Sequence, residues 1–174
     1  LLEESKLAEE TNTRLRALWI AASLFREHPE VDLLEEVRRQ IEQQASTALS
    51  LEDRAEHALG KAFCLYFSGE RTRSLEIVNC TIGELEERKV KNSVYLALLL
   101  GLSAIHGALG EYERAVLLGE KGVRAAREMG EERRLRIFAA NIALFHSRLG
   151  NHDLQLLWAS RATGDKWGVR DRVL

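Results

Sequence analysis

The chain has 174 residues, of which 45% are apolar and 30% charged, which is an ordinary balance for a globular domain. Its 25 basic and 27 acidic side chains give a net charge of −2, so nothing global favours binding to nucleic acid or to an anionic membrane. No run of about 18 apolar residues is present, and the sequence therefore predicts no membrane-spanning segment. We expect a cytoplasmic protein, cut from a longer chain because the sequence does not open with methionine.

Apolar residues at steps of three and four predict helices along almost the whole chain. The pattern begins with Leu15, Leu18 and Trp19, and a single proline in the sequence leaves the later helices uninterrupted. The predicted helices cover residues 14–27, 31–49, 53–68, 71–88, 92–109, 112–129, 133–149 and 152–163.

The breaks between these helices recur at a nearly constant spacing. Gly69, Gly110 and Gly150 follow one another at intervals of 41 and 40 residues, and counting back 41 from Gly69 reaches His28, beside Pro29. A fixed period of this size is typical of stacked repeats. The short turns require antiparallel neighbours. We therefore predict an all-α fold of about four helix hairpins, at residues 12–49, 53–88, 92–129 and 133–163, with residues 164–174 as a cap or a linker.

Small residues within the helices carry a family resemblance, and the third unit shows it best. There the pattern consists of Leu99, Leu102, Ser103, Gly110, Tyr112, Ala115, Gly119 and Gly122. The fourth unit retains Ala139, Ile142, Ala143, Gly150, Ala159 and Ala162. The chain thus resembles the tetratricopeptide repeat (TPR) family, in the form with long repeats found in bacterial regulatory proteins. The resemblance implies a right-handed superhelix that binds peptides or protein segments and performs no chemistry.

The same resemblance implies that the first helix of each hairpin lines a concave groove. Transferred to this sequence, the groove positions are Phe25, Arg26, Phe63, Tyr66, Phe67, Leu100, Ala104, Asn141, Leu144 and Arg148. This face is apolar for a surface, and Arg26 and Arg148 are available for acidic groups of a partner. The alternative is that Phe63 and Phe67 pack between hairpins as core residues. Asn141 is either a donor and acceptor for a peptide backbone or an ordinary polar side chain.

Residues able to perform other chemistry do not group in the sequence. His106 and His146 occupy equivalent positions 40 residues apart and are expected to pack, with a pH-sensitive role as the alternative. They lack further ligands at metal-binding spacing, so we predict neither a metal nor a cofactor. Cys64 and Cys80 are expected to be reduced and mostly buried. The basic residues near the link at Gly130, which include Arg133 and Arg136, are expected to be solvated, with binding of a partner's acidic patch as the alternative.

The predicted function is protein or peptide binding by a TPR module, in the sensory or regulatory region of a larger bacterial signalling protein such as a diguanylate cyclase or a transcription regulator. The alternative is a structural role in homo-oligomerisation, including a homodimer. An enzyme is a third reading, which no motif in the sequence favours. We expect no nucleic-acid or membrane partner for this domain.

Overall fold

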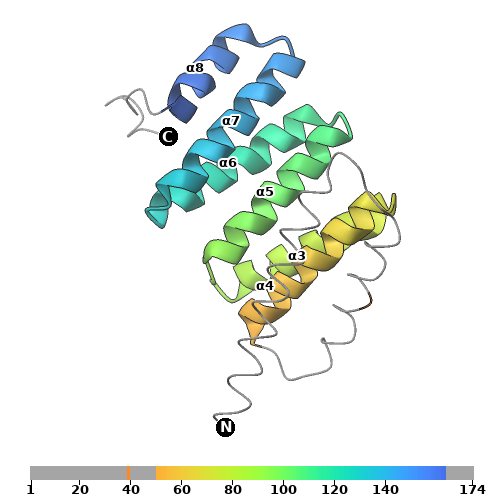
Figure 1. The fold of residues 1–174 in the computed structure, drawn as a ribbon. Helices are drawn as coiled ribbons and strands as arrows, with labels where there is room; N and C mark the ends of the chain where they lie inside the picture. The colour runs from red at the N-terminus through yellow and green to blue at the C-terminus, as the bar shows by residue number, and fades with distance from the viewer. Residues whose placement is uncertain (1–38, 40–49, 164–174) are drawn as a thin grey trace. The chain divides into compact units, whose positions relative to one another are not determined.

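The computed structural model describes Arg39 and residues 50–163 (Figure 1). The first predicted hairpin, residues 12–49, lies outside the described part except for Arg39, and so do residues 164–174. Contacts divide the chain into two compact units, residues 1–88 and residues 89–174.

The described part is built from six consecutive α-helices. The first unit contains α3 (Leu51–Phe67) and α4 (Arg71–Glu87), and the second contains α5 (Ser93–Ala108), α6 (Tyr112–Glu128), α7 (Glu132–Arg148) and α8 (His152–Thr163). The predicted helices agree with these bounds to within two residues. Within each unit consecutive helices pack against each other, and α5 also contacts α7. The prediction of an all-α, TPR-like fold of antiparallel hairpins is confirmed.

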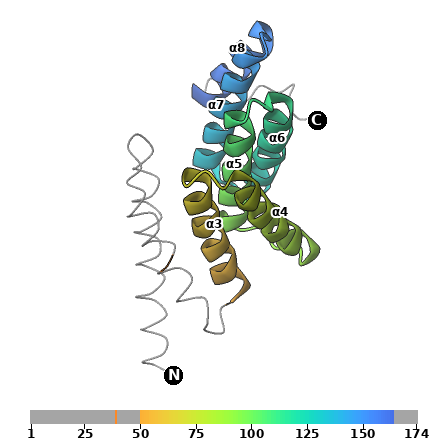
Figure 2. The same ribbon diagram turned by 90° about the vertical axis from the view of Figure 1, so that its right-hand side faces the viewer.

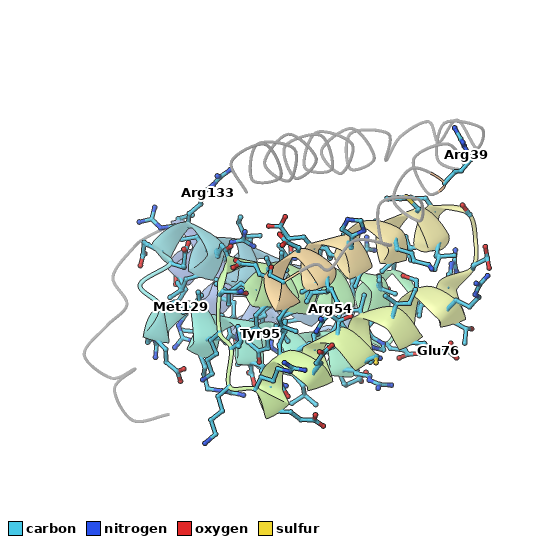
Figure 3. The ribbon with its side chains drawn as sticks, turned by 90° about the horizontal axis from the view of Figure 1, so that it is seen from below. Arg39, Arg54, Glu76, Tyr95, Met129 and Arg133 are labelled. Carbon is cyan, nitrogen blue, oxygen red and sulfur yellow. The ribbon has the colours of Figure 1, made fainter. Side chains whose placement is uncertain are left out.

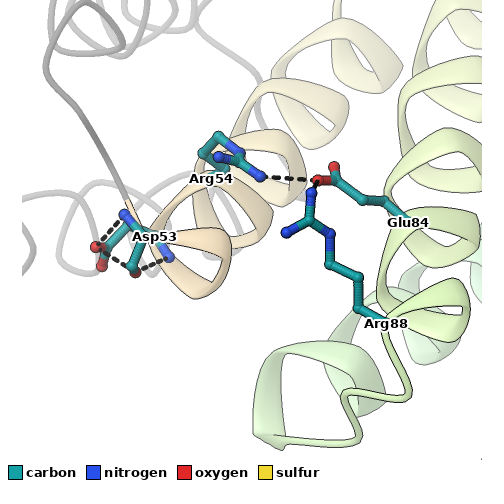
Figure 4. A network of polar contacts seen from close by, with 5 residues as sticks. Asp53, Arg54, Glu84 and Arg88 are labelled. Atoms are coloured by element: carbon teal, nitrogen blue, oxygen red, sulfur yellow. Dashed lines mark hydrogen bonds and ion pairs between the residues drawn. The ribbon is translucent and has the colours of Figure 1, made fainter.

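The hairpin of α3 and α4 is fixed at its open end by polar contacts (Figure 4). The Ser50 hydroxyl accepts a hydrogen bond from the Asp53 backbone N–H at 3.1 Å, and the Ser50 backbone N–H donates to Asp53 Oδ2 at 3.3 Å. This capping box satisfies two amide groups at the start of α3. The Glu84 carboxylate of α4 forms ion pairs with Arg54 of α3 at 2.7 Å and with Arg88 at 3.3 Å. These three side chains are exposed or half-buried, so the ion pairs contribute little to stability.

Helix ends depend on residues in the left-handed backbone region. Gly69, Gly110, Gly130 and Gly150 have φ values between 70° and 87°, and each follows the last turn of a helix. Glycine adopts this conformation without the steric cost that a Cβ imposes. The link after α4 uses Lys89 instead, with φ of 56°.

In two hairpins a serine hydroxyl forms a buried hydrogen bond with an alanine carbonyl of the neighbouring helix. In the first unit, the Ser74 hydroxyl of α4 donates to the Ala62 carbonyl of α3 at 2.6 Å. In the next hairpin, the Ser103 hydroxyl of α5 donates to the Ala115 carbonyl of α6 at 2.8 Å. Since 62 and 103, like 74 and 115, differ by the repeat of 41, the same contact is made with the serine on opposite helices.

The interface between α6 and α7 joins consecutive hairpins through glycines and large apolar side chains. A Cβ added to Gly122 would lie 2.3 Å from the Phe138 ring, and one added to Gly119 would lie 2.7 Å from Ile142 Cγ1. On α5, a Cβ at Gly107 would lie 2.3 Å from the Phe145 ring. Three side chains of α7, at positions i, i+4 and i+7, therefore fill three glycine sites, which is why α7 approaches both preceding helices so closely.

The core of the second unit is almost entirely apolar. Figure 3 shows Tyr95 among the helices, and this side chain is buried together with Leu98, Leu99, Ile105, Phe138 and Ile142. Both cysteines are free, as expected, and Cys64 is buried. The expectation for Cys80 was wrong, because its side chain is exposed on α4.

Candidate protein-binding face

Five of the predicted groove residues lie on α5 and α7. They are Leu100, Ala104, Asn141, Leu144 and Arg148, which we call the groove face. In Figure 2, α6 lies to the right of α5 and α7, so the two first helices share one side of the second unit. Spacings of four residues on α5, and of three and four on α7, place the members on one stripe of each helix.

The groove face combines apolar area with a cation. The side chain of Leu144 is 53% exposed, which is unusual for a leucine in the middle of a helix with a packed opposite side. Arg148 lies one turn further on, is exposed, and forms no ion pair with any residue of the described part. Asn141, Leu100 and Ala104 are half-buried. A partner segment with an apolar side chain next to a carboxylate would match this arrangement.

The predicted aromatic residues lie in the other unit, on α3. Phe63 and Phe67 stack with ring centroids 6.3 Å apart, and Tyr66 meets Phe67 edge to face at 5.4 Å. Arg71 lies over the Tyr66 ring at 5.9 Å. All three rings are half-buried, so they form a cluster that is neither core nor free surface. Phe25 and Arg26 lie outside the described residues.

A hollow of about 510 Å³ lies beside the groove face, at the other end of α7. Its lining consists of Glu132, Arg133, Arg136, Ile137, Ala140 and Ala162. Figure 3 shows Arg133 extending outward from the first turn of α7. The sequence predicted Arg133 and Arg136 to be solvated, with an acidic patch of a partner as the alternative, and gave no role to Ile137 or Ala140. The available signal was Ile137, an apolar residue on the stripe of α7 that otherwise faces solvent.

The two equivalent histidines are packing residues in the structure. His106 and His146 are both buried, and His106 Nδ1 lies 2.7 Å from Glu111 Oε2. At the position of Glu111 the fourth hairpin has Asn151, and His146 Nδ1 has no hydrogen-bond partner in the described part. Within residues 50–163 no group of three His, Cys, Asp or Glu side chains is placed to hold a metal ion.

A third histidine, His57 of α3, has a perturbed acidity. Its side chain is 8% exposed, and neither ring nitrogen has a hydrogen-bond partner among the described residues. Burial lowers the pKa of His57 below its usual value of 6.5, and the negative charges of Asp53 and Glu56 oppose this shift. The imidazole is therefore held neutral and serves as a packing group.

Comparison with known proteins supports the fold and leaves the partner open. No protein-family model matches the sequence, and no curated protein matches it. The structure is similar to the crystal structure of BtubC (BKLC) from P. vanneervenii, with a TM-score of 0.73 over 99% of this chain and 71% of that chain. At 13% sequence identity, this likeness establishes the TPR-like fold alone. Among the described helices, none is long and apolar enough to cross a bilayer.

Proposed function

We propose that this chain is a protein-binding module whose groove face takes an acidic, apolar segment of a partner protein. The observation that carries the proposal is the half-exposed Leu144 beside Arg148 of α7, which forms no ion pair with a described residue. Burying a leucine side chain of this exposure contributes about 1 kcal/mol, and a partly desolvated carboxylate on Arg148 adds specificity for acidic partners.

The half-buried neighbours on the groove face extend this surface. Leu100 and Ala104 offer apolar area on α5, and the Asn141 amide can donate to and accept from a peptide backbone. The occupant that fits is an extended peptide or one face of a helix. The aromatic cluster of Phe63, Tyr66 and Phe67 is a second surface for the same purpose in the first unit.

The test uses an array of immobilised 15-residue peptides that combine Asp or Glu with Leu or Phe, probed with the labelled full chain. Leu144→Asp and Arg148→Glu should each reduce the signal of the bound peptides at least tenfold. Leu117→Asp and Arg124→Glu are the matched controls, because both residues are exposed on α6, away from the groove face. Equal losses in the variants and the controls would contradict the proposal.

We further propose that the module acts as the sensory or regulatory region of a larger signalling protein, in which an occupied groove alters an attached domain. The resemblance to helical arrays of bacterial regulators is the support for this role. Homo-oligomerisation is the alternative, and the exposed Leu154, Leu156 and Leu157 of α8 favour it. Sedimentation at several concentrations separates the two, because a strictly monomeric chain excludes self-assembly.

A further inference from the structure

The starting observation is the site that α7 itself occupies on the preceding hairpin. Gly107, Gly119 and Gly122 receive its Phe145, Ile142 and Phe138 side chains. Leu96 and Val116, which belong to the same hairpin, are 0% and 8% exposed. We call Leu96, Gly107, Val116, Gly119 and Gly122 the inner seat. The inner seat shows what a helix docked on the end of a hairpin looks like in this protein.

The same five positions recur 40 residues later, at Arg136, Ser147, Leu156, Ala159 and Ala162, which we call the terminal seat. No described helix covers them. The side chain of Leu156 is 68% exposed, whereas that of its counterpart Val116 is 8% exposed. Arg136 is also exposed, whereas its counterpart Leu96 is fully buried. The hollow of about 510 Å³ lies beside Ala162, the counterpart of the glycine that receives Phe138. The terminal seat therefore has the form of the inner seat, and no helix of the described part occupies it.

Differences between the two seats define what the terminal seat can hold. A Cβ at position 119 or 122 of the inner seat would lie only 2.7 Å or 2.3 Å from the α7 side chains, so the alanines at 159 and 162 leave less room than those glycines do. A helix with phenylalanine at these contacts would overlap with the alanines, whereas leucine or valine would fit. Arg136 stands where the inner seat has Leu96, and it forms an ion pair with Glu132 at 3.3 Å. Arg133, in the same turn of α7, pairs with no described residue. The charge of the seat therefore favours carboxylates on the incoming helix.

We propose that the terminal seat docks an amphipathic helix of a partner protein that carries aliphatic side chains at positions i, i+4 and i+7 and acidic residues beside them. This surface is separate from the groove face, and the inference does not rest on the proposed function. The helix occupies the seat as α7 occupies the inner seat, with one aliphatic side chain in the hollow and carboxylates near Arg133 and Arg136.

The probe for the test is a fluorescein-labelled, stapled peptide of 17 residues, the length of α7. It carries Leu, Val and Leu where α7 has Phe138, Ile142 and Phe145, glutamate on the flanking positions, and alanine elsewhere. Fluorescence anisotropy with the full chain should show saturable binding that weakens as salt is raised. Leu156→Ser and Arg136→Glu should each weaken binding about tenfold or more, which corresponds to about 1.4 kcal/mol. Arg136→Lys should retain binding within threefold.

Controls separate this surface from its neighbours. Leu117→Ser removes a leucine that is 65% exposed but lies on α6, outside the terminal seat, and should leave binding unchanged. Arg124→Glu changes an exposed arginine of α6, outside both the terminal seat and the groove face, and should also have no effect. A probe with Phe in place of Leu and Val should bind at least tenfold more weakly.

Three results would overturn the proposal. Equal losses in Leu156→Ser and Leu117→Ser would show that the peptide binds to apolar surface in general. Self-association of the full chain that competes with the probe would identify a second copy as the occupant. Binding that emerges only after residues 164–174 are deleted would identify the chain's own end as the cover of the seat.

Discussion

Gly122 offers the sharpest test of how α7 is held against α6. An alanine Cβ at this position would lie 2.3, 2.4 and 2.6 Å from three carbons of the Phe138 ring. Favourable carbon contacts lie near 3.5–4.0 Å, so the ring or the helix must shift by about 1 Å or more. Phe138 is 0% exposed and has no solvent-facing side to move toward. Overpacking of this kind costs about 1–3 kcal/mol.

Helix propensity works in the opposite direction, because alanine is favoured over glycine by about 1 kcal/mol within a helix. With the overlap at the upper end of its range, we expect Gly122→Ala to lower the free energy of unfolding by about 1–2 kcal/mol. Gly83→Ala on α4 is the matched control, since a Cβ there meets nothing within 4 Å. It should raise stability by about 0.5–1 kcal/mol.

Urea denaturation followed by circular dichroism measures both changes. Adding Phe138→Leu to Gly122→Ala should recover part of the loss, with a coupling energy of about 1 kcal/mol in the double-mutant cycle. If Gly122→Ala stabilises the protein as much as Gly83→Ala does, the close approach of α6 and α7 is not the reason for the glycine.

Three further predictions concern the hairpins themselves. Ser74→Ala should lower the free energy of unfolding by about 1 kcal/mol in urea melts. Adding Ala62→Ser should restore most of this loss, because a serine at position 62 can donate as Ser103 does. A double variant that stays as unstable as Ser74→Ala would contradict the equivalence of the two hairpins. Lys89→Gly should raise the melting temperature, because it removes the steric cost of about 1 kcal/mol that a lysine Cβ has in the left-handed region. Gly130→Lys should lower the melting temperature for the same reason. Because burial lowers the pKa of His57, the neutral side chain contributes its full stability above pH 6.5, and this contribution is lost as the pH falls further. Thermal melts should therefore show a lower melting temperature at pH 5.0 than at pH 7.5, and His57→Phe should abolish this difference.

The fold was largely predictable because its signals are local. Glycines at 69, 110, 130 and 150 close helices through their own backbone conformation, and the apolar pattern sets the helices between them. Lys89 carries no such signal, since lysine is uncommon at positive φ, and its role depends on the neighbouring helix ends. The burial of Cys80 was predicted wrongly because its apolar neighbours suggested that it shares the packed side of α4, whereas that side consists of Ser74, Val78, Ile82 and Leu85.

The candidate site was less accessible to sequence reasoning, because exposure depends on which helices lie next to each other. The resemblance to TPR arrays placed Leu144 and Arg148 among the groove positions, and both side chains are exposed on α7. The same reasoning left Ile137 and Ala140 unnoticed. Their exposure follows from the lack of a described helix beyond α8, and no periodicity within a single helix reports on that.

The serine that changes sides between hairpins has a consequence for engineering repeat arrays. A consensus sequence is usually built by choosing the commonest residue at each repeat position. When the repeats are aligned, one column contains Ala62, Ser103 and Ala143, and its consensus residue is alanine. The column of the opposite helix contains Ser74, Ala115 and Gln155, and no residue type there has a majority. An averaged hairpin would therefore lose a buried hydrogen bond that both parent hairpins possess. Pairs of columns, rather than single columns, are the units that such a design should preserve.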